Sequence, residues 1–461
     1  MTPHLPWGGI SFPRQLLSHH YLVIGQNQSG KTLLIRMLSA SALCPDRGSL
    51  KERALVFDAK LEWYGVLRGL GVPESQILVL NPFDARATAW DIARDTTDSG
   101  AVRQIAHILI PVEPNSTQPY FANAARELVA VVIEIFRTFA PDQWTLNDVI
   151  EAFSDEHDLK SVLALTPEGR NALARYVLGN EKSSADVLST LDTKLKPFAV
   201  AARLAARCTQ RVSFREWSKS DFSRILLLGR DDTVASAMDP LNRAMVKCAV
   251  QYVLGRVEED PADQTWFFLD ECRWAGELDG LQGLLLKGRS KGAYAVLGLQ
   301  DVQGMRHVYG QYQADEILAQ CGNVAVLRLM CPDTMRWAAQ LFGRYEEYLE
   351  GFGESETSGV QSSRTSSHDW KLSERPSILE QQFRSFPLPE PRIGIWGAFL
   401  CPGYAWMDCV PPQFIEVYLR AKSADAGFIP RPVCDQDRLP WTAAFRSRLQ
   451  RKLQTLDTDE E

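Results

Sequence analysis

Short, continuous runs of apolar residues alternate with amphipathic segments along most of this chain. Such runs are typical of strands that are buried on both faces in a parallel sheet, and most of the segments between them have the period of an α-helix. The pattern therefore predicts an α/β fold with a mainly parallel central sheet. The expected strands are Tyr21–Ile24, Ala54–Phe57, Ile77–Leu80, Ile225–Leu228, Trp266–Leu269, Ala293–Leu299 and Val324–Leu329, with a further strand or hairpin from Ile393 to Leu400 at the sheet edge.

One long interval, from about Ile92 to Arg215, departs from this alternation. It contains almost no strand signal but several helical ones, of which the clearest is Tyr120–Phe139, where apolar residues form a stripe along one face. We therefore expect an all-α domain that is inserted into the α/β domain. The expected boundaries are residues 96–215 for the inserted domain, and residues 1–95 together with 216–420 for the α/β domain.

Two segments toward the C-terminus have a biased composition. Residues 352–370 are rich in Ser, Thr and Gly, which predicts a flexible loop. Residues 421–461 form a C-terminal extension, in which the basic stretch Arg446–Lys452 precedes an acidic end at Asp457–Glu461. Such an end is either a solvated tail or a contact for a partner.

Length, composition and charge limit the class of protein. A chain of 461 residues exceeds the usual size of a single core, so we expect two or more domains. With 45% hydrophobic and 23% charged residues, no membrane-spanning apolar stretch and no secretory signal, a soluble cytoplasmic protein is expected. The nine cysteines have no C-x-x-C spacing, which indicates neither a disulfide framework nor a zinc site. The net charge of −7 excludes a surface that is basic throughout, so nucleic acid would bind only locally.

The first expected strand runs into a glycine-rich loop and then into a helical pattern. The loop matches the phosphate-binding pattern G-x-x-x-x-G-K-T in its required setting, strand before and helix after. Its backbone N–H groups would point at phosphate oxygens, Lys31 would neutralise the β- and γ-phosphates, and the Thr32 hydroxyl would hold Mg²⁺. The competing interpretation is a glycine-rich turn before an ordinary helix. The loop residues, which would bind a nucleoside triphosphate such as ATP, are Gly25, Gln26, Asn27, Gln28, Ser29, Gly30, Lys31 and Thr32.

A second candidate element is the apolar strand Gln264–Leu269, which two carboxylates follow. Asp270 would complete the Mg²⁺ shell, and Glu271 would orient and polarise the attacking water. Many strands end in acidic residues, so this signal is weak alone. The phosphate loop in the same chain makes it a credible Walker B element.

Two further polar residues follow expected strands, at the edge where ligands bind in open parallel sheets. Gln300 would converge with Lys31 and Glu271 and sense the γ-phosphate, or it is simply a polar strand cap. Asp58 would support the metal shell or contact the nucleotide, or it caps a helix together with Glu62. Both alternatives stay open for each residue.

Arg289 is expected at the opposite edge of the sheet. The pattern from Trp274 to Gly288 is helical, and about 15 residues at 1.5 Å each would carry the chain about 22 Å back from Glu271. Arg289 could then stabilise the transition state only in a neighbouring subunit, as an arginine finger in trans. The alternative is a surface arginine that interacts with a helix dipole.

Together these residues resemble one known family, the coupling ATPases of conjugative type IV secretion systems (TraD/TrwB type), within the FtsK/HerA group of hexameric DNA translocases. The resemblance covers roughly residues 15–400 and includes the distances from Asp270 and Glu271 to Arg289 and Gln300. The segments that carry it, besides the phosphate loop, are Val56–Lys60, Leu80–Asp84 with Trp90, Tyr120–Arg126, Gln264–Glu271, Gly288–Gly292 and Gly298–Gln300.

The resemblance implies a RecA-like nucleotide domain that bears an all-α domain and assembles as a homo-hexamer around a channel for DNA. It assigns the nucleotide roles to Lys31, Thr32, Asp270 and Glu271, the finger to Arg289 and the sensor to Gln300. Members of the family usually begin with membrane-spanning helices, whereas this chain starts almost directly at the phosphate loop. We therefore expect a cytoplasmic protein, either free or recruited to the inner face of the membrane by a partner.

Two classes of function fit these residues. The first is an ATP-driven motor that moves DNA through a pore with little sequence specificity, or delivers a relaxase–DNA complex to a secretion channel. The second is a nucleotide-dependent assembly or recruitment scaffold in a mobile-element or defence complex. Retention of Glu271 favours turnover but leaves the substrate open, and stimulation of ATP hydrolysis by DNA would separate the two. A small-molecule kinase has little support, because the helical insertion suits a translocase core better.

Overall fold

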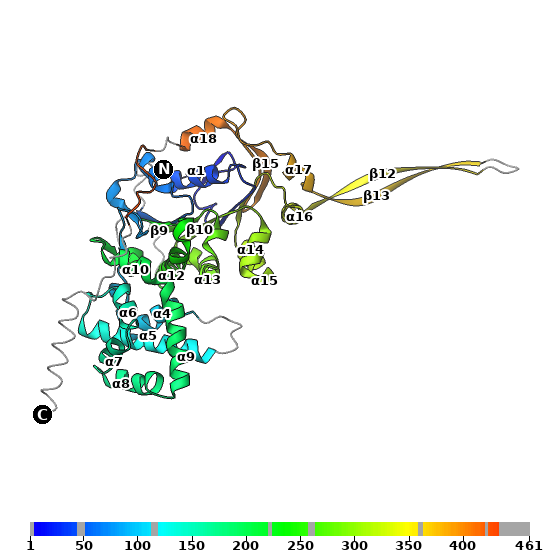
Figure 1. The fold of residues 1–461 in the computed structure, drawn as a ribbon. Coiled ribbons are helices and arrows are strands. Elements are labelled where there is room, and N and C mark those ends of the chain that lie inside the picture. The colour runs from blue at the N-terminus through cyan, green and yellow to red at the C-terminus, as the bar shows by residue number, and fades with distance from the viewer. Residues whose placement is uncertain are drawn as a thin grey trace, which may run out of the picture. The chain divides into compact units, whose positions relative to one another are not determined.

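The computed structural model describes residues 4–43, 51–111, 119–219, 224–256, 263–357, 363–419 and 423–432. The chain divides into two compact units (Figure 1). The first unit contains residues 1–41 and 298–419, and the second contains residues 42–297 and 420–461. The basic stretch and the acidic end of the predicted C-terminal extension lie outside the described residues.

Five parallel strands form the core of the second unit. Neighbouring strands pair in parallel, and the apolar side chains of the strands are buried. These two features confirm the predicted mainly parallel sheet. Val56, for example, lies opposite Phe268 on one side and Leu227 on the other. The strands are β10 (Ala293–Leu299), β9 (Asp263–Leu269), β4 (Lys51–Asp58), β8 (Ile225–Gly229) and β5 (Ile77–Val79).

The first unit has its own strands. β3 (Tyr21–Ile24) pairs in parallel with β11 (Asn323–Val326), and β11 pairs in antiparallel fashion with the hairpin of β14 (Ile395–Cys401) and β15 (Tyr404–Val410). The hairpin confirms the strand expected from Ile393, whereas β11 ends three residues earlier than predicted. A short N-terminal hairpin, β1 (His4–Trp7) and β2 (Ile10–Pro13), packs its Trp7 ring edge-on against Tyr21.

Helices accompany these strands in the first unit, as the alternating pattern predicts. They are α1 (Lys31–Leu43), whose last two residues belong to the second unit, α14 (Val302–Tyr309), α15 (Gln311–Ala319), α16 (Pro332–Leu341), α17 (Glu380–Ser385) and α18 (Pro412–Tyr418). Among the described parts of the chain, no helix is long and apolar enough to cross a membrane.

A run of helices lies between two short strands that pair with each other, β6 (Ala89–Trp90) and β7 (Arg211–Val212). α12 (Ala235–Leu254), outside this run in sequence, contacts its helices α4 and α10 as well as α11. The run comprises α3 (Ile92–Asp95), α4 (Ser99–Leu109), α5 (Pro119–Phe139), α6 (Leu146–Ala152), α7 (Glu156–Leu163), α8 (Pro167–Ala172), the π-helical η3 (Leu173–Val177), α9 (Glu181–Leu195), η4 (Lys196–Phe198) and α10 (Ala199–Ala206), and α11 (Phe214–Lys219) follows β7.

A buried carboxylate joins the two ends of this helical run. Asp95, at the end of α3, accepts hydrogen bonds from the Trp90 indole (2.7 Å), the Ser213 hydroxyl (2.6 Å) and the backbone N–H groups of Phe214 (3.1 Å) and Arg215 (3.0 Å). Burial raises the pKa of Asp95, and these donors oppose that rise. The chain therefore leaves and re-enters the sheet at one hydrogen-bonded junction.

The segment from Trp274 to Gly288 is not the single helix that the pattern predicts. It contains a 3₁₀ turn, η6 (Cys272–Ala275), and a seven-residue helix, α13 (Leu281–Lys287), followed by a second 3₁₀ turn, η7 (Gly288–Lys291). Gly276 and Gly280 separate them with positive φ angles of 69° and 96°, a conformation that ends a helix. A helix of this length advances only about 10 Å, so the predicted single helix over this segment was wrong.

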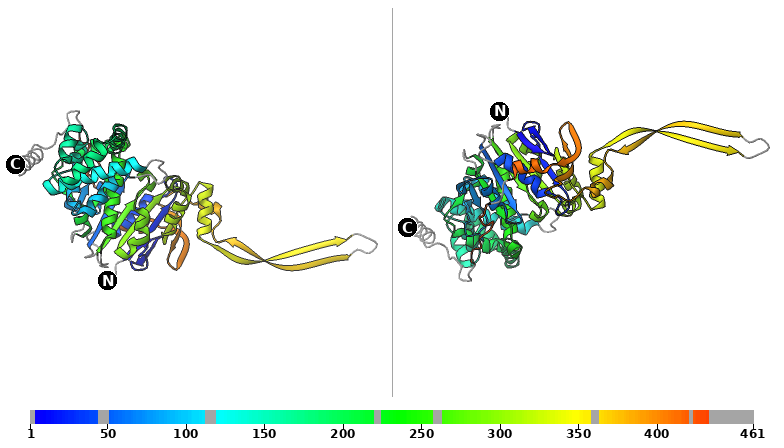
Figure 2. Two further views of the ribbon diagram at one scale, coloured as in Figure 1. Left: turned by 90° about the horizontal axis from the view of Figure 1, so that it is seen from below. Right: turned by 90° about the horizontal axis from the view of Figure 1, so that it is seen from above.

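The loop predicted over residues 352–370 was also wrong for the described part of that segment. β12 (Arg344–Thr357) and β13 (Ser363–Pro376) form a two-stranded antiparallel hairpin, in register from Arg344 opposite Pro376 to Thr357 opposite Ser363. Figure 2 shows the hairpin extending away from α16 and α17. A two-stranded ribbon has no buried face of its own, so it does not require the apolar alternation that strand prediction relies on.

Replacing Asp95 tests the junction at the base of the helical run. Asp95→Ala leaves four buried donors without their acceptor, and we expect it to lower the free energy of unfolding by about 3 kcal/mol or more. Urea unfolding followed by circular dichroism measures the change. The control is Asp98→Ala, which removes an exposed cap of α4 and should cost only about 1 kcal/mol. Equal effects of the two substitutions would contradict a special role for the junction.

Candidate functional site

The Gly25–Thr32 loop connects β3 to α1 in the first unit. The Gly25 N–H group donates to the carbonyl of Leu299, the last residue of β10, at 3.0 Å. The Gln26 N–H group donates to the Arg328 carbonyl, just beyond β11, at 2.8 Å. These two hydrogen bonds hold the start of the loop at the carboxyl end of β3.

Two glycines are required by the tight curl of this loop. A Cβ atom on Gly25 would lie 2.5 Å from Ser29 Oγ and 2.9 Å from Leu327 Cβ, so no larger residue fits. Gly30 has a φ angle of 100°, which residues with a Cβ rarely adopt, and Gln28 also has a positive φ of 64°. The backbone conformation of the loop thus favours glycine at both positions.

Lys31 begins α1 and folds back over the loop. Its side chain is buried, and Nζ donates to the carbonyls of Gly25 (2.8 Å) and Gln26 (3.3 Å). The first turn of α1 contains no acidic residue, and the Thr32 side chain is partly exposed. An ammonium group at a helix N-terminus favours a bound anion, and a neighbouring hydroxyl is a suitable oxygen ligand for Mg²⁺.

Asp270 and Glu271 follow β9 in the second unit. Both residues are buried, at 5% and 6% exposure. Glu271 adopts a left-handed backbone conformation (φ 58°, ψ 47°), which costs a residue with a Cβ on the order of 1 kcal/mol. The chain turns sharply here into η6, where the Trp274 N–H group donates to the Glu271 carbonyl at 2.9 Å. Backbone strain of this kind at a buried carboxylate is typical of functional sites.

Lys60 is a neighbour of Glu271 that the sequence interpretation did not assign. Its Nζ lies 3.7 Å from Glu271 Oε1, and the Lys60 side chain is half exposed while that of Glu271 is 8% exposed. The parallel pairing of β4 with β9, which the tertiary structure decides, brings the two residues together. Phe57 lies opposite Leu269, so the residues just beyond both strands meet at one edge.

Asp58 shapes the turn that carries Lys60. Its carboxylate accepts the backbone N–H groups of Lys60 (3.3 Å), Glu62 (3.1 Å) and Trp63 (2.8 Å), the last of which begins α2 (Trp63–Gly69). Burial raises the pKa of Asp58 to about 6, although these donors act to lower it. Of the two roles left open for Asp58, these contacts correspond to the helix cap.

Arg289 and Glu271 lie at opposite edges of the parallel strands. Arg289 is exposed in η7, just before β10, and the Gly292 carbonyl accepts the N–H group of Thr265 near the start of β9. Glu271 follows the other end of β9. The structure thus keeps Arg289 apart from its own Glu271, through strand register and not through a long helix.

Gln300 lies one residue beyond β10, next to the Leu299 carbonyl that accepts the Gly25 N–H group. Within the first unit, the structure therefore brings Gln300 close along the backbone to the start of the Gly25–Thr32 loop. Its side chain is partly exposed.

The residues from 4 to 388 match the family model of the type IV secretion-system coupling protein DNA-binding domain. The chain belongs to this family.

Relatives agree with this assignment. The chain is 23% identical over 349 residues to the coupling protein TraD of Escherichia coli (strain K12). The aligned region covers 74% of this chain and 46% of TraD, so the chain spans about half the length of that relative. The unbound structure of the bacterial conjugative coupling protein TrwBdeltaN70 covers 93% of this chain and 92% of its own, at 18% identity and a TM-score of 0.72. TrwB in complex with ADP and Mg²⁺ covers 94% and 93%, at 18% identity and a TM-score of 0.70. This likeness confirms the predicted fold class.

One of the segments that resemble the coupling-protein family, Leu80–Asp84, has a structural role in this chain. In Leu80–Asp84, the Asn81 side chain accepts the Phe83 N–H group (3.1 Å), and Asp84 binds the Arg86 guanidinium through both oxygens (3.0 and 2.7 Å). These contacts close the turn after β5. The segment therefore supports the sheet edge and contributes no reactive group.

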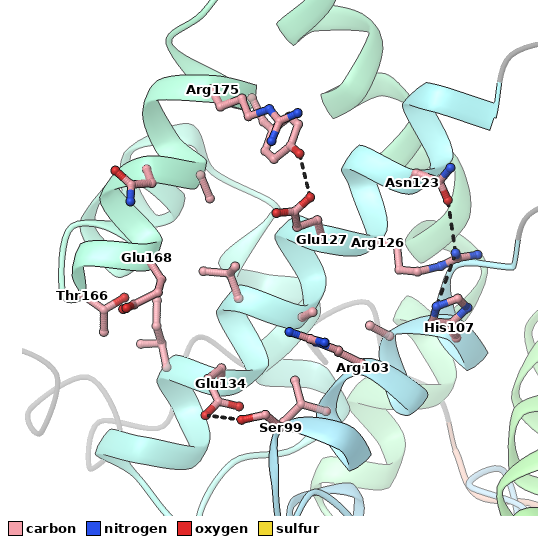
Figure 3. A pocket seen from close by; sticks show the side chains of 18 of the residues that line it. Ser99, Arg103, His107, Asn123, Arg126, Glu127, Glu134, Thr166, Glu168 and Arg175 are labelled. Carbon is pink, nitrogen blue, oxygen red and sulfur yellow. Dashed lines mark hydrogen bonds between the residues drawn. The ribbon is translucent and has the colours of Figure 1, made fainter.

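A cavity of about 970 Å³ lies among the helices α4, α5, α8 and η3 (Figure 3). Several of its acidic and basic side chains form hydrogen bonds with polar neighbours in the lining. Tyr176 donates to Glu127 (2.7 Å), and Arg126 contacts Asn123 (3.2 Å) and His107. Because charges of both signs line this cavity, it favours neither an anionic nor a cationic ligand.

The buried Asp58 carboxyl predicts a pH dependence of stability. The pKa of Asp58 is about 6 in the folded protein, above the ordinary aspartate value of 3.8, so the folded state binds the proton more tightly than the unfolded chain does. The stabilisation is complete below the unfolded pKa and is lost as the pH rises through about 6. Between pH 7 and pH 5, the wild type should gain about 1 kcal/mol relative to Asp58→Asn. Unfolding curves of both proteins at the two pH values measure this gain, and a constant difference between them would contradict the assignment.

Proposed function

We propose that this chain is an ATP-hydrolysing coupling protein that moves DNA, or delivers a relaxase–DNA complex, in conjugative transfer or a related mobile-element process. The observation that carries the proposal is the Gly25–Thr32 loop with its buried Lys31, in a chain of the coupling-protein family. Structures of TrwB with ADP and Mg²⁺, and with a non-hydrolysable GTP analogue, support a nucleotide at this loop.

The proposed roles follow from the chemistry of the side chains. The loop N–H groups and Lys31 bind the phosphates, and Thr32 with Asp270 would hold Mg²⁺, which neutralises phosphate charge. Glu271 orients the attacking water, and Gln300 responds to the γ-phosphate. We assign both motifs to the same nucleotide because phosphoryl transfer needs phosphate-binding and water-orienting groups together.

The fixed cation at Lys60 fits this assignment of Glu271. An ammonium group whose Nζ lies 3.7 Å from Glu271 Oε1 helps to hold this carboxylate at the end of β9, where it can accept a hydrogen bond from water. Because Glu271 is only 8% exposed, this partner is less screened than a surface ion pair would be. The turn held by Asp58 thereby supports the reactive group.

We further propose that Arg289 acts in a neighbouring copy of the chain. Arg289 is exposed and lies at the edge of the strands opposite to its own Glu271, so the site that it serves belongs to another subunit. Closed rings satisfy this requirement at every subunit, and we propose a homo-hexamer around DNA. Relaxase or secretion-channel proteins are the proposed partners, and the cytoplasmic face of the membrane is the proposed place of action.

Two substitutions test the nucleotide site. Lys31→Ala should abolish binding of a fluorescent ATP analogue, because the phosphates lose their cation. Glu271→Gln should bind the analogue normally but reduce ATP turnover at least about 100-fold, because the amide cannot accept the proton of water. Lys182→Ala, at an exposed helical position, is the control. Normal turnover by Glu271→Gln would contradict the water-orienting role. Stimulation of ATP hydrolysis by DNA would separate a DNA motor from an assembly scaffold.

Mixing inactive variants tests the arginine finger. Arg289→Ala should lose turnover by about 10³-fold while nucleotide binding remains. Adding the Lys31→Ala protein should partly restore turnover, because its intact Arg289 serves the intact pocket of the other variant. Lys287→Ala, exposed in the same region, should keep full activity alone. A mixture that stays inactive in mixed oligomers would contradict the action in trans.

A further inference from the structure

A second cavity, of about 930 Å³, lies in the second unit beside the edge strand β5. We call it the basic cleft, because the described part of its lining includes five arginines and one acidic residue, Glu74. The arginines are Arg86, Arg207, Arg211, Arg224 and Arg431. The chain as a whole has a net charge of −7, so this concentration of positive charge is local. It differs in this respect from the cavity of Figure 3, which has charges of both signs.

Two of these arginines build the wall of the cleft. Arg86, which binds Asp84, also donates to the carbonyls of Ala426 (2.8 Å) and Gly427 (3.1 Å). Arg431 donates to the Leu204 carbonyl at 3.1 Å. Both guanidinium groups thus fasten residues 423–432 along the cleft. They stabilise its shape and have less capacity for a ligand.

Arg211 and Arg224 are different. Arg211 is exposed on β7, and Arg224 is partly buried just before β8. Among the described residues, neither side chain forms a hydrogen bond or an ion pair with the protein, although Arg211 interacts at longer range with Asp91 and Asp148. Their guanidinium groups are therefore available to a ligand.

The backbones that carry these two side chains are fixed. The Arg224 carbonyl accepts the Trp217 indole N–H group (3.1 Å) and the Ala54 N–H group (3.3 Å), and Arg211 lies opposite Ala89 in the pair of β7 with β6. A fixed backbone reduces the entropy that is lost when a long side chain binds a ligand. Planar guanidinium groups match phosphate oxygens through paired hydrogen bonds.

Among the residues that the structure describes, the lining of the cleft offers no aromatic face for a nucleobase. The aromatic residue in its lining is Tyr64, and the Arg86 guanidinium covers the Tyr64 ring at 3.8 Å. Base stacking is the usual way in which proteins read single-stranded nucleic acid beyond its backbone. A ligand here would be held through phosphate groups alone, with strong salt dependence and little dependence on base sequence.

We propose that the basic cleft binds the phosphate backbone of DNA, through Arg211 and Arg224. This inference rests on the DNA-moving role proposed above and names a place of contact on the chain. DNA is favoured over an acidic protein segment because the family model describes a DNA-binding domain. The size of the cleft also suits several phosphate groups in succession.

Fluorescence anisotropy with a labelled single strand of mixed sequence tests the proposal on the full chain. The variant Arg211→Gln with Arg224→Gln should bind about tenfold more weakly at low salt, and the slope of log affinity against log salt should fall by about 1.4, two phosphate contacts at about 0.7 each. Arg211→Lys with Arg224→Lys should restore most of the affinity. The control, Lys182→Gln with Arg384→Gln, removes the same charge from exposed positions outside the cleft and should bind normally.

The outcomes separate this inference from the function on which it rests. If the wild type binds no DNA at low salt, the DNA role itself is wrong. If the wild type binds DNA and the glutamine variant binds equally well, with the same melting temperature and the same nucleotide affinity, the cleft is not a DNA contact. Stronger competition by polyglutamate than by unlabelled DNA would identify a protein ligand and would also overturn the proposal.

Discussion

The parallel pairing of β4 with β9 is the constraint on which the candidate chemistry of the second unit depends. With Phe57 opposite Leu269, the residues just beyond the two strands must meet at one edge of the sheet. That edge carries Asp270 and Glu271 from one strand and the turn containing Lys60 from the other. A slip of one residue would turn every side chain of β4 to the opposite face of the sheet and would separate Lys60 from Glu271, so the packing of the core fixes the electrostatics of the site.

Backbone hydrogen bonds extend this order to the groups around it. In the first unit, the Leu299 carbonyl fixes Gly25 and thereby the start of the Gly25–Thr32 loop. In the second unit, the three N–H groups held by Asp58 set the turn at Lys60, and the four donors on Asp95 close the helical run. Each buried carboxylate is kept by donors that offset its desolvation. Polar groups, as well as apolar packing, therefore define this fold.

The distribution of charge gives these parts different chemical characters. An acidic chain repels a polyanion on average, so a contact with DNA requires local concentrations of arginine such as the basic cleft. The cavity among the helices, in contrast, is lined by charges of both signs. The β12–β13 hairpin is a third kind of part. Each of its strands has 14 residues, and a two-stranded ribbon cannot bury an apolar face by itself.

The sequence by itself determined the α/β class, most strands, the helical run and the family, because buried parallel strands and the phosphate loop leave local patterns of apolar residues and glycines. Prediction from the sequence failed where the local pattern of residues carries no signal for the structure. The helical period from Trp274 to Gly288 did not reveal the break at two glycines with positive φ, and the polar composition of residues 352–370 did not reveal a hairpin. Lys60 beside Glu271 and the arginines of the basic cleft come from segments far apart in the chain. Only strand register and packing bring such residues together, and these are decided by the tertiary structure.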